Sequence, residues 1–193
     1  MVKTRRIAPD AKLEAILQAA EGLFSQQGYS ATTIAAIADR AGVAVGTIYR
    51  FFPEKSALLR SLHQRVADRM IEAMRIGWQS EPDFAQRFLP MICALFDTAV
   101  RDRELLIVLQ TARDASPEQF SKAIDKIVTA IRHMYIQGLE CGIYRQFDPT
   151  IAANIAYGMV EGAMRALMAG KASFPRKVLE DQLATAMSSV FVR

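Results

Sequence analysis

Apolar residues recur with a helical period along most of the chain, and the first clear example lies between residues 10 and 28. The five apolar positions of this stretch are spaced i, i+3, i+4, i+7 and i+11, which places them on one face of a helix. Asp10 can cap the start of this helix, and Gly28 can end it in the left-handed conformation. The stripe consists of Leu13, Ile16, Leu17, Ala20 and Phe24.

Two short helices and one long helix are expected next. The first short helix is expected from Thr33 to about Arg40, and Gly42 separates it from a second one that runs from about Ala44 to Phe51. Pro53 fits the first turn of the long helix, which is expected to end near Trp78.

The rest of the sequence also predicts helices, and no run of alternating β-branched residues competes with this interpretation. A helix from residue 80 to about 102 has to bend or break at Pro90, which lacks the N–H group that a helix interior requires. Gly142 marks the end of a later helix, and Asp148-Pro149 marks the start of the next. The further helices are expected over residues 104–113, 117–141, 149–170 and 176–192. The chain is therefore predicted to be all-α, with about nine helices and no internal repeat.

The excess of positive over negative charge lies entirely in the first third of the chain. Residues 1–65 hold nine Lys or Arg against five Asp or Glu, whereas residues 66–193 hold fifteen of each. Binding to a polyanion such as DNA requires an excess of this kind, because released counterions supply much of the affinity. We therefore expect a DNA-binding domain (residues 1–53) followed by a second helical domain (residues 54–193).

Other features exclude several classes of protein. The longest apolar stretch, Phe88–Phe96, contains a proline and is too short to cross a bilayer, and no apolar signal segment follows the basic N-terminus. We expect a cytoplasmic protein without a membrane partner. Cys93 and Cys141 lack the CxxC spacing of a zinc site, and no Gly-rich phosphate loop, HExxH or GxSxG motif is present. Neither a metal, a cofactor nor an enzymatic activity is expected.

Residues 33–52 have the arrangement that a helix-turn-helix requires. Ala38 and Ala41 are small enough for the two short helices to pack closely, and Gly42 makes the sharp turn between them. In this motif the N-terminal end of the second helix enters the major groove of DNA. The candidate DNA-binding residues are Thr33, Ala44, Val45, Gly46, Thr47, Tyr49, Arg50 and Lys55. Among these, phosphate contacts are expected from Thr33, Thr47, Tyr49 and Lys55.

Residues 33–55 resemble the DNA-binding domain of the TetR/AcrR family of repressors. The resemblance is strong over about residues 10–60, and the order and length of the helices agree over the rest. It implies a one-component transcriptional regulator, most often a repressor, that binds a palindromic DNA operator as a homodimer. It also implies that residues 54–193 are a helical ligand-binding and dimerisation domain, in which a small effector moves the fourth helix and releases the DNA. The signature residues are Gly42, Val43, Gly46, Thr47, Tyr49, Phe52 and Lys55.

Two positions depart from the family pattern. Position 44 is often a Ser that caps the recognition helix, and here it is Ala. Position 51 is commonly Tyr or His, and Phe51 cannot donate a hydrogen bond to a phosphate. Base recognition is then expected to depend on shape and on thymine methyl groups. These departures keep open an alternative, a helical ligand-binding protein that has lost DNA binding. An architectural DNA-binding protein without an effector would need a basic surface beyond residue 65, where the net charge is zero.

A strip of small residues follows Pro149, and it lets another helix approach closely. Gly158, Gly162, Ala166 and Gly170 recur every four residues. The resemblance implies the same location, because the last two helices of the family form a four-helix bundle across the dimer. The alternative is that the strip packs within its own subunit. The expected dimer-interface residues are Ile155, Gly158, Met159, Gly162, Ala166, Leu179, Leu183, Met187 and Val190.

Large, soft side chains are frequent between residues 70 and 135. Methionine adapts to irregular shapes and suits apolar pockets, although any helical core also uses such residues. The absence of a strongly charged cluster favours a neutral or apolar small effector. The candidate effector-binding residues are Met70, Met74, Trp78, Phe88, Phe96, Arg113, Met134 and Tyr135.

Overall fold

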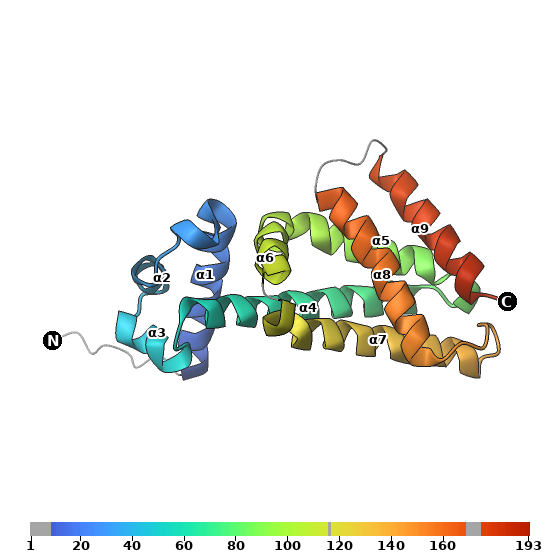
Figure 1. Ribbon diagram of the computed structural model, residues 1–193, viewed down its shortest axis with the longest axis horizontal. Helices are drawn as coiled ribbons and strands as arrows, with labels where there is room; N and C mark the ends of the chain where they lie inside the picture. The colour runs from blue at the N-terminus through green and yellow to red at the C-terminus, as the bar shows by residue number, and fades with distance from the viewer. Residues whose placement is uncertain (1–8, 116, 169–174) are drawn as a thin grey trace. The chain divides into compact units, whose positions relative to one another are not determined.

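The computed structural model describes residues 9–115, 117–168 and 175–193. Within these ranges the chain forms nine α-helices and two short 3-10 helices (Figure 1), which confirms the all-α prediction. The α-helices are α1 (Pro9–Ala31), α2 (Ile34–Ala41), α3 (Val45–Phe51), α4 (Lys55–Ser80), α5 (Phe88–Arg101), α6 (Arg103–Ala115), α7 (Ser121–Glu140), α8 (Pro149–Met168) and α9 (Arg176–Phe191). The 3-10 helices are η1 (Phe84–Gln86) and η2 (Pro117–Phe120). None of the described helices combines the length and the apolar character needed to cross a lipid bilayer.

Glycines end or interrupt helices where the sequence predicts it. Gly42 adopts the left-handed conformation (φ 65°, ψ 34°) after α2, and Gly142 has φ 72° after α7. Gly28 also has a positive φ, but its ψ of 167° is extended rather than left-handed, and the helical turn resumes until Ala31. The predicted strip glycine at position 170 lies outside the described residues.

Two proline predictions were wrong. Pro53 is not in the first turn of the long helix, because α4 begins two residues later at Lys55. Pro90 does not break a helix either, because it is the third residue of α5. Backbone N–H groups in the first turn have no partner within the helix, so a proline costs no hydrogen bond there. The helical path is instead interrupted before α5, between Ser80 and Phe88. In this interval Asp83 caps η1 by accepting a hydrogen bond from Ala85 N (2.9 Å).

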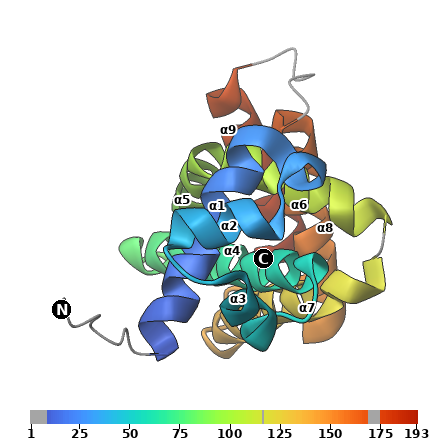
Figure 2. The same ribbon diagram turned by 90° about the vertical axis from the view of Figure 1, so that its left-hand side faces the viewer.

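The contacts within the chain divide it into two compact units. The first contains the described residues up to Arg65 together with Glu104–Phe120, and the second contains Val66–Arg103 and Ser121–Arg193. Figure 2 shows α1, α2 and α3, which belong to the first unit. The fully buried apolar residues of the first unit include Ile16, Ala20, Phe24, Ile37, Ile48, Leu58 and Leu62. The predicted domain boundary at residue 53 stays a prediction.

In the second unit α7 packs against α8, and α9 packs against both α5 and α8. Two glycines permit close approaches that the sequence did not reveal. A Cβ added at Gly77 of α4 would lie 2.4 Å from the carbonyl oxygen of Pro90 in α5. A Cβ at Gly138 of α7 would lie 2.2 Å from the ring of Tyr144. Any side chain at these two positions would force backbone or a packed ring to move.

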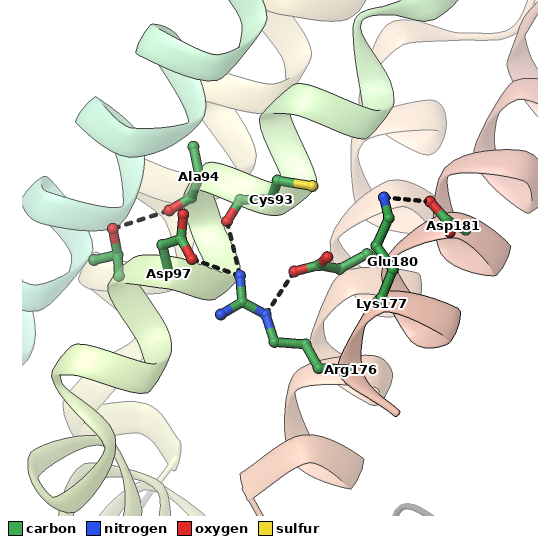
Figure 3. Close-up of polar contacts among 8 residues, drawn as sticks. Cys93, Ala94, Asp97, Arg176, Lys177, Glu180 and Asp181 are labelled. Atoms are coloured by element: carbon green, nitrogen blue, oxygen red, sulfur yellow. Dashed lines mark hydrogen bonds and ion pairs between the residues drawn. The ribbon is translucent and has the colours of Figure 1, made fainter. Parts of the chain in front are cut away.

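Arg176, at the start of α9, links this helix to α5 by hydrogen bonds (Figure 3). Its guanidinium donates to Asp97 Oδ1 (2.6 Å) and to Glu180 Oε1 (2.6 Å), and so compensates the charge of the buried Glu180 side chain. Cys93 lies beside this cluster. Burial, with the nearby Glu180 carboxylate as the second cause, raises the pKa of the Cys93 thiol. The thiol therefore stays protonated at neutral pH and is a poor nucleophile.

Candidate functional site

The turn between α2 and α3 is built from local hydrogen bonds. Thr33 caps α2, and its hydroxyl oxygen accepts a hydrogen bond from Ala36 N (3.1 Å). After Gly42, Val43 N donates to Ala38 O (3.0 Å), which closes the turn. Ala44 precedes α3 without any side-chain cap, as its methyl group requires. This geometry is the helix-turn-helix that the sequence predicts.

One face of α3 is buried and the other is exposed. Ile48 is 0% exposed and anchors the helix in the first unit, whereas Tyr49 is 52% and Val45 40% exposed. A Cβ added at Gly46 would meet no atom within 4 Å, so the backbone is open to a partner at this point. Arg50 is also exposed. The structure therefore brings Ala44, Val45, Gly46, Tyr49 and Arg50 onto one open surface, with Thr47 half-buried at its edge.

Lys55, the first residue of α4, binds the protein's own backbone. Its Nζ donates to Tyr29 O (2.8 Å) and Thr32 O (2.9 Å), and it lies 4.3 Å from the centre of the Tyr29 ring. An ammonium group has three N–H donors, so two of them are engaged in joining the start of α4 to the end of α1. The sequence predicted a phosphate contact for Lys55 and gave no signal for this role. The phosphate contact stays a prediction.

Some basic side chains of the first unit have hydrogen-bond partners within the protein, and Arg50 differs from them. Arg65 donates to Glu14 Oε1 (2.9 Å), and this hydrogen bond is the main cause that lowers the pKa of Glu14. Arg40 donates to Gln26 Oε1 (2.8 Å). Arg50, by contrast, makes no ion pair with any described residue. It is therefore the basic residue of the recognition helix that is available to an anionic partner.

The second unit encloses a small cavity of about 20 Å³ between α4, α5, α7, α8 and α9. Five of the eight predicted effector-binding residues line it: Met74, Trp78, Phe88, Met134 and Tyr135. Met70 and Phe96 are buried in the same unit but are not part of its wall, because their side chains pack elsewhere in the core. Arg113 belongs to the other unit. The wall is completed by Met91, Ile131, Tyr144, Ala152, Ala156, Val160, Met187 and Phe191.

The wall of the cavity is apolar and uncharged. Tyr135 Oη donates to the carbonyl of Arg145, and Tyr144 Oη donates to Phe84 O (3.2 Å). Burial raises the pKa of both phenols, so both remain neutral. None of the described lining residues carries a charge. An apolar occupant thus meets no desolvated ion in this cavity.

The predicted dimer strip is only partly on the surface. Ile155 is 41% exposed, and added Cβ atoms at Gly158 and Gly162 would meet nothing within 4 Å. Leu183 and Met187 lie inside the protomer, contrary to the prediction, because their stripe of α9 packs against α5 and α8. Met159, Ala166, Leu179 and Val190 are half-buried. Ile151 and Val178 are exposed apolar residues that the sequence-based set lacked.

α2 and α3 form a helix-turn-helix in which α3 has one buried face and one open face, and comparisons with known proteins show which regulators share this motif. The family model for bacterial regulatory proteins of the tetR family matches residues 16–62. The fatty acid metabolism regulator protein of Bacillus subtilis is 25% identical over 151 residues, which cover 76% of this chain and 78% of that protein. The transcriptional repressor KstR of Rhodococcus jostii is 49% identical over 55 residues, 28% of this chain and 26% of KstR.

A solved structure extends the similarity beyond the DNA-binding segment. The crystal structure of FadR from Bacillus subtilis in complex with stearoyl-CoA matches with a TM-score of 0.76 over 92% of this chain and 98% of FadR, at 21% identity. At this identity the match establishes the fold. Residues 16–62 thus carry the segment that is typical of bacterial regulatory proteins of the tetR family.

Proposed function

We propose that this protein is a ligand-responsive transcriptional repressor that binds operator DNA through α3 and is released by a small apolar effector. The observation that carries the DNA-binding part is the open face of α3, where Val45 and Tyr49 are exposed above the buried Ile48. An apolar and an aromatic side chain exposed next to each other on one helix face suit a surface that a partner covers. The relatives' names support regulation of transcription as the outcome.

In this proposal Val45 and Gly46 approach the base edges, and Thr47, Tyr49 and Arg50 contact bases or phosphates. The free backbone N–H groups at the start of α2, next to Thr33, form a second phosphate site. Lys55 contributes mainly by fixing α4 against the end of α1, so that α3 is held in position.

We also propose that the protein acts as a homodimer on a palindromic operator. A single recognition helix reads too few base pairs to select one site in a genome, and two-fold symmetry doubles the contacts. The exposed Ile151, Ile155 and Val178, together with the open positions at Gly158 and Gly162, form the surface proposed for the partner subunit. Exposed apolar side chains next to small residues on a helix pair suit a protein–protein interface.

The effector is proposed to enter the cavity of the second unit. Its neutral, apolar wall suits a molecule with a long hydrocarbon part, in line with a relative named for fatty acid metabolism and a structural neighbour that holds stearoyl-CoA. A volume of about 20 Å³ admits little more than one water molecule, so such a ligand must push the lining helices apart. Because Met74 and Trp78 of the wall belong to α4, opening of the cavity moves the helix that continues into the first unit.

Fluorescence anisotropy with double-stranded DNA tests the proposal. We expect the wild-type protein to bind fragments from the promoter region beside its own gene with a nanomolar to micromolar dissociation constant. Tyr49→Ala should weaken this binding about tenfold or more, whereas Phe147→Ala, which removes an exposed aromatic ring from the second unit, should leave it unchanged. Equal binding by wild type and Tyr49→Ala would contradict the role of α3. Absence of specific DNA binding would favour a ligand-binding protein that has lost this activity, consistent with the missing cap at Ala44.

A further inference from the structure

Among the described residues of the cavity wall, Trp78 carries a polar group that has no hydrogen-bond partner. Its side chain lies near the end of α4, lines the cavity and is only 3% exposed. Its indole Nε1 is buried and has no hydrogen-bond partner among the described residues. The indole N–H is a donor only, so no rearrangement of its own proton can satisfy it.

The surroundings hold the indole ring firmly. Phe88 and Tyr144 meet it edge-to-face, with ring centres 5.7 Å and 6.3 Å away, and Phe84 does the same at 6.3 Å. The guanidinium of Arg87 lies 5.7 Å from the ring centre. A ring packed on several sides cannot turn freely to find a partner for its N–H group. Buried donors without partners are rare in native proteins, and a functional site is one of the recognised reasons for them.

The other strong donors of the wall are already engaged. The hydroxyl groups of Tyr135 and Tyr144 both donate to backbone carbonyls, and methionine sulfur is only a weak acceptor. Among the described lining residues, the N–H of Trp78 is therefore the one strong donor that remains for a ligand.

We propose that the Trp78 indole N–H selects the effector, which carries an uncharged oxygen acceptor, such as the carbonyl of a ketone, ester or thioester, next to its apolar part. This inference rests on the proposed function of the cavity as the effector site. A carboxylate in the cavity would be desolvated without a cationic residue among the described lining residues, and a pure hydrocarbon would leave the N–H unpaired. A site that offers a buried donor discriminates against analogues that lack the acceptor. Any charged part of the effector lies outside this wall.

A matched pair of probes tests this proposal. Acetophenone and α-methylstyrene have the same planar shape, but a carbonyl oxygen in the first is a methylene group in the second. Trp78 is the single tryptophan of the chain, so a ¹⁵N-labelled sample gives one indole N–H signal in a proton–nitrogen correlation spectrum. We expect acetophenone to move the indole proton downfield as the hydrogen bond forms, and α-methylstyrene to cause no such downfield shift.

Variants provide the second readout. Trp78→Phe keeps an aromatic ring and removes the N–H, and it should weaken acetophenone binding about five- to tenfold while changing α-methylstyrene binding less than twofold. Phe88→Leu, in the same wall, should weaken both probes to the same extent. Folding of both variants is checked by circular dichroism, and the labelled wild-type protein gives the result even where a variant fails to fold.

The possible results distinguish a failure of the role of Trp78 from a failure of the cavity as the effector site. Binding of both probes with equal affinity, equally affected by Trp78→Phe and without a downfield shift, would overturn the role of Trp78 and leave the cavity as the effector site. Failure of both probes to bind up to their solubility limits would count against the cavity itself, and the inference about Trp78 would fall with it.

Discussion

Replacing Lys55 with methionine removes the ammonium group and keeps a flexible side chain of similar length. Two roles can be assigned to this lysine: a phosphate contact, as the sequence predicts, or a brace between α4 and α1, as its hydrogen bonds to Tyr29 O and Thr32 O indicate. The two roles have different consequences for stability and for the salt dependence of DNA binding. Lys55→Met therefore distinguishes them.

The size of the stability change follows from the contacts. A hydrogen bond from a charged donor contributes about 1.5–3 kcal/mol. Lys55 is half-buried, so water can replace part of each of its two bonds in the variant. The lysine also lies over the Tyr29 ring, a cation–π contact of about 0.5–1 kcal/mol. We expect a loss of about 2 kcal/mol in the free energy of unfolding, which corresponds to a Tm lower by about 4–8 °C for a chain of this length.

The assay combines urea unfolding with DNA affinities measured over a range of salt concentrations. Each phosphate contact contributes about 0.9 to the slope of log K against log salt concentration. We expect Lys55→Met to bind DNA more weakly with an unchanged slope, because α3 is less well positioned. Arg50→Met is the matched control. It should keep its stability within about 0.5 kcal/mol and lose about 0.9 in slope, because Arg50 is exposed and has no ion-pair partner among the described residues.

The opposite pattern would refute this reasoning. If Lys55→Met unfolds at the wild-type urea concentration and its salt slope falls by about 0.9, Lys55 is a phosphate contact and the bonds to Tyr29 and Thr32 contribute little.

Three further substitutions follow from the packing. Gly77→Ala should lower the free energy of unfolding by about 2–3 kcal/mol, because the new Cβ would stand 2.4 Å from Pro90 O. Gly46→Ala in α3, whose Cβ meets nothing within 4 Å, should be neutral or stabilising in the absence of DNA, and equal losses in the two would contradict the close approach. Gly162→Leu should shift sedimentation toward monomer, and an unchanged profile would exclude the proposed interface. Thr33→Ala should cost about 1 kcal/mol in urea unfolding by removing the cap of α2, and a wild-type midpoint would show that the cap is not needed.

The helix-turn-helix could be predicted from the sequence because its determinants are local. The period of the apolar residues sets the faces of α2 and α3, and the left-handed turn at Gly42 needs only the nature of that one residue. The uncapped start of α3 at Ala44 was predictable for the same reason. Element order and helix count depend on the same short-range rules.

The parts that could not be predicted depend on contacts between distant segments. Tyr144 lies in a loop without helical period, and its place in the cavity is set by Gly138 and by stacking on Phe88. The apolar stripe of α9 that contains Met187 fits a dimer surface and an internal core equally well. Because α5 and α8 pack against α9, this stripe belongs to the core of the protomer. The partners of Lys55 are likewise more than 20 residues away in the chain.

Selection of bound sequences from a random double-stranded DNA library, carried out in parallel with wild type and Tyr49→Ala, tests whether α3 reads DNA within a two-fold dimer. We expect the wild-type protein to enrich an inverted repeat whose half-sites are about one or two helical turns apart, and Tyr49→Ala to enrich it far less or not at all. Recovery of the unselected library by folded wild-type protein, or the same motif from both proteins, would contradict it.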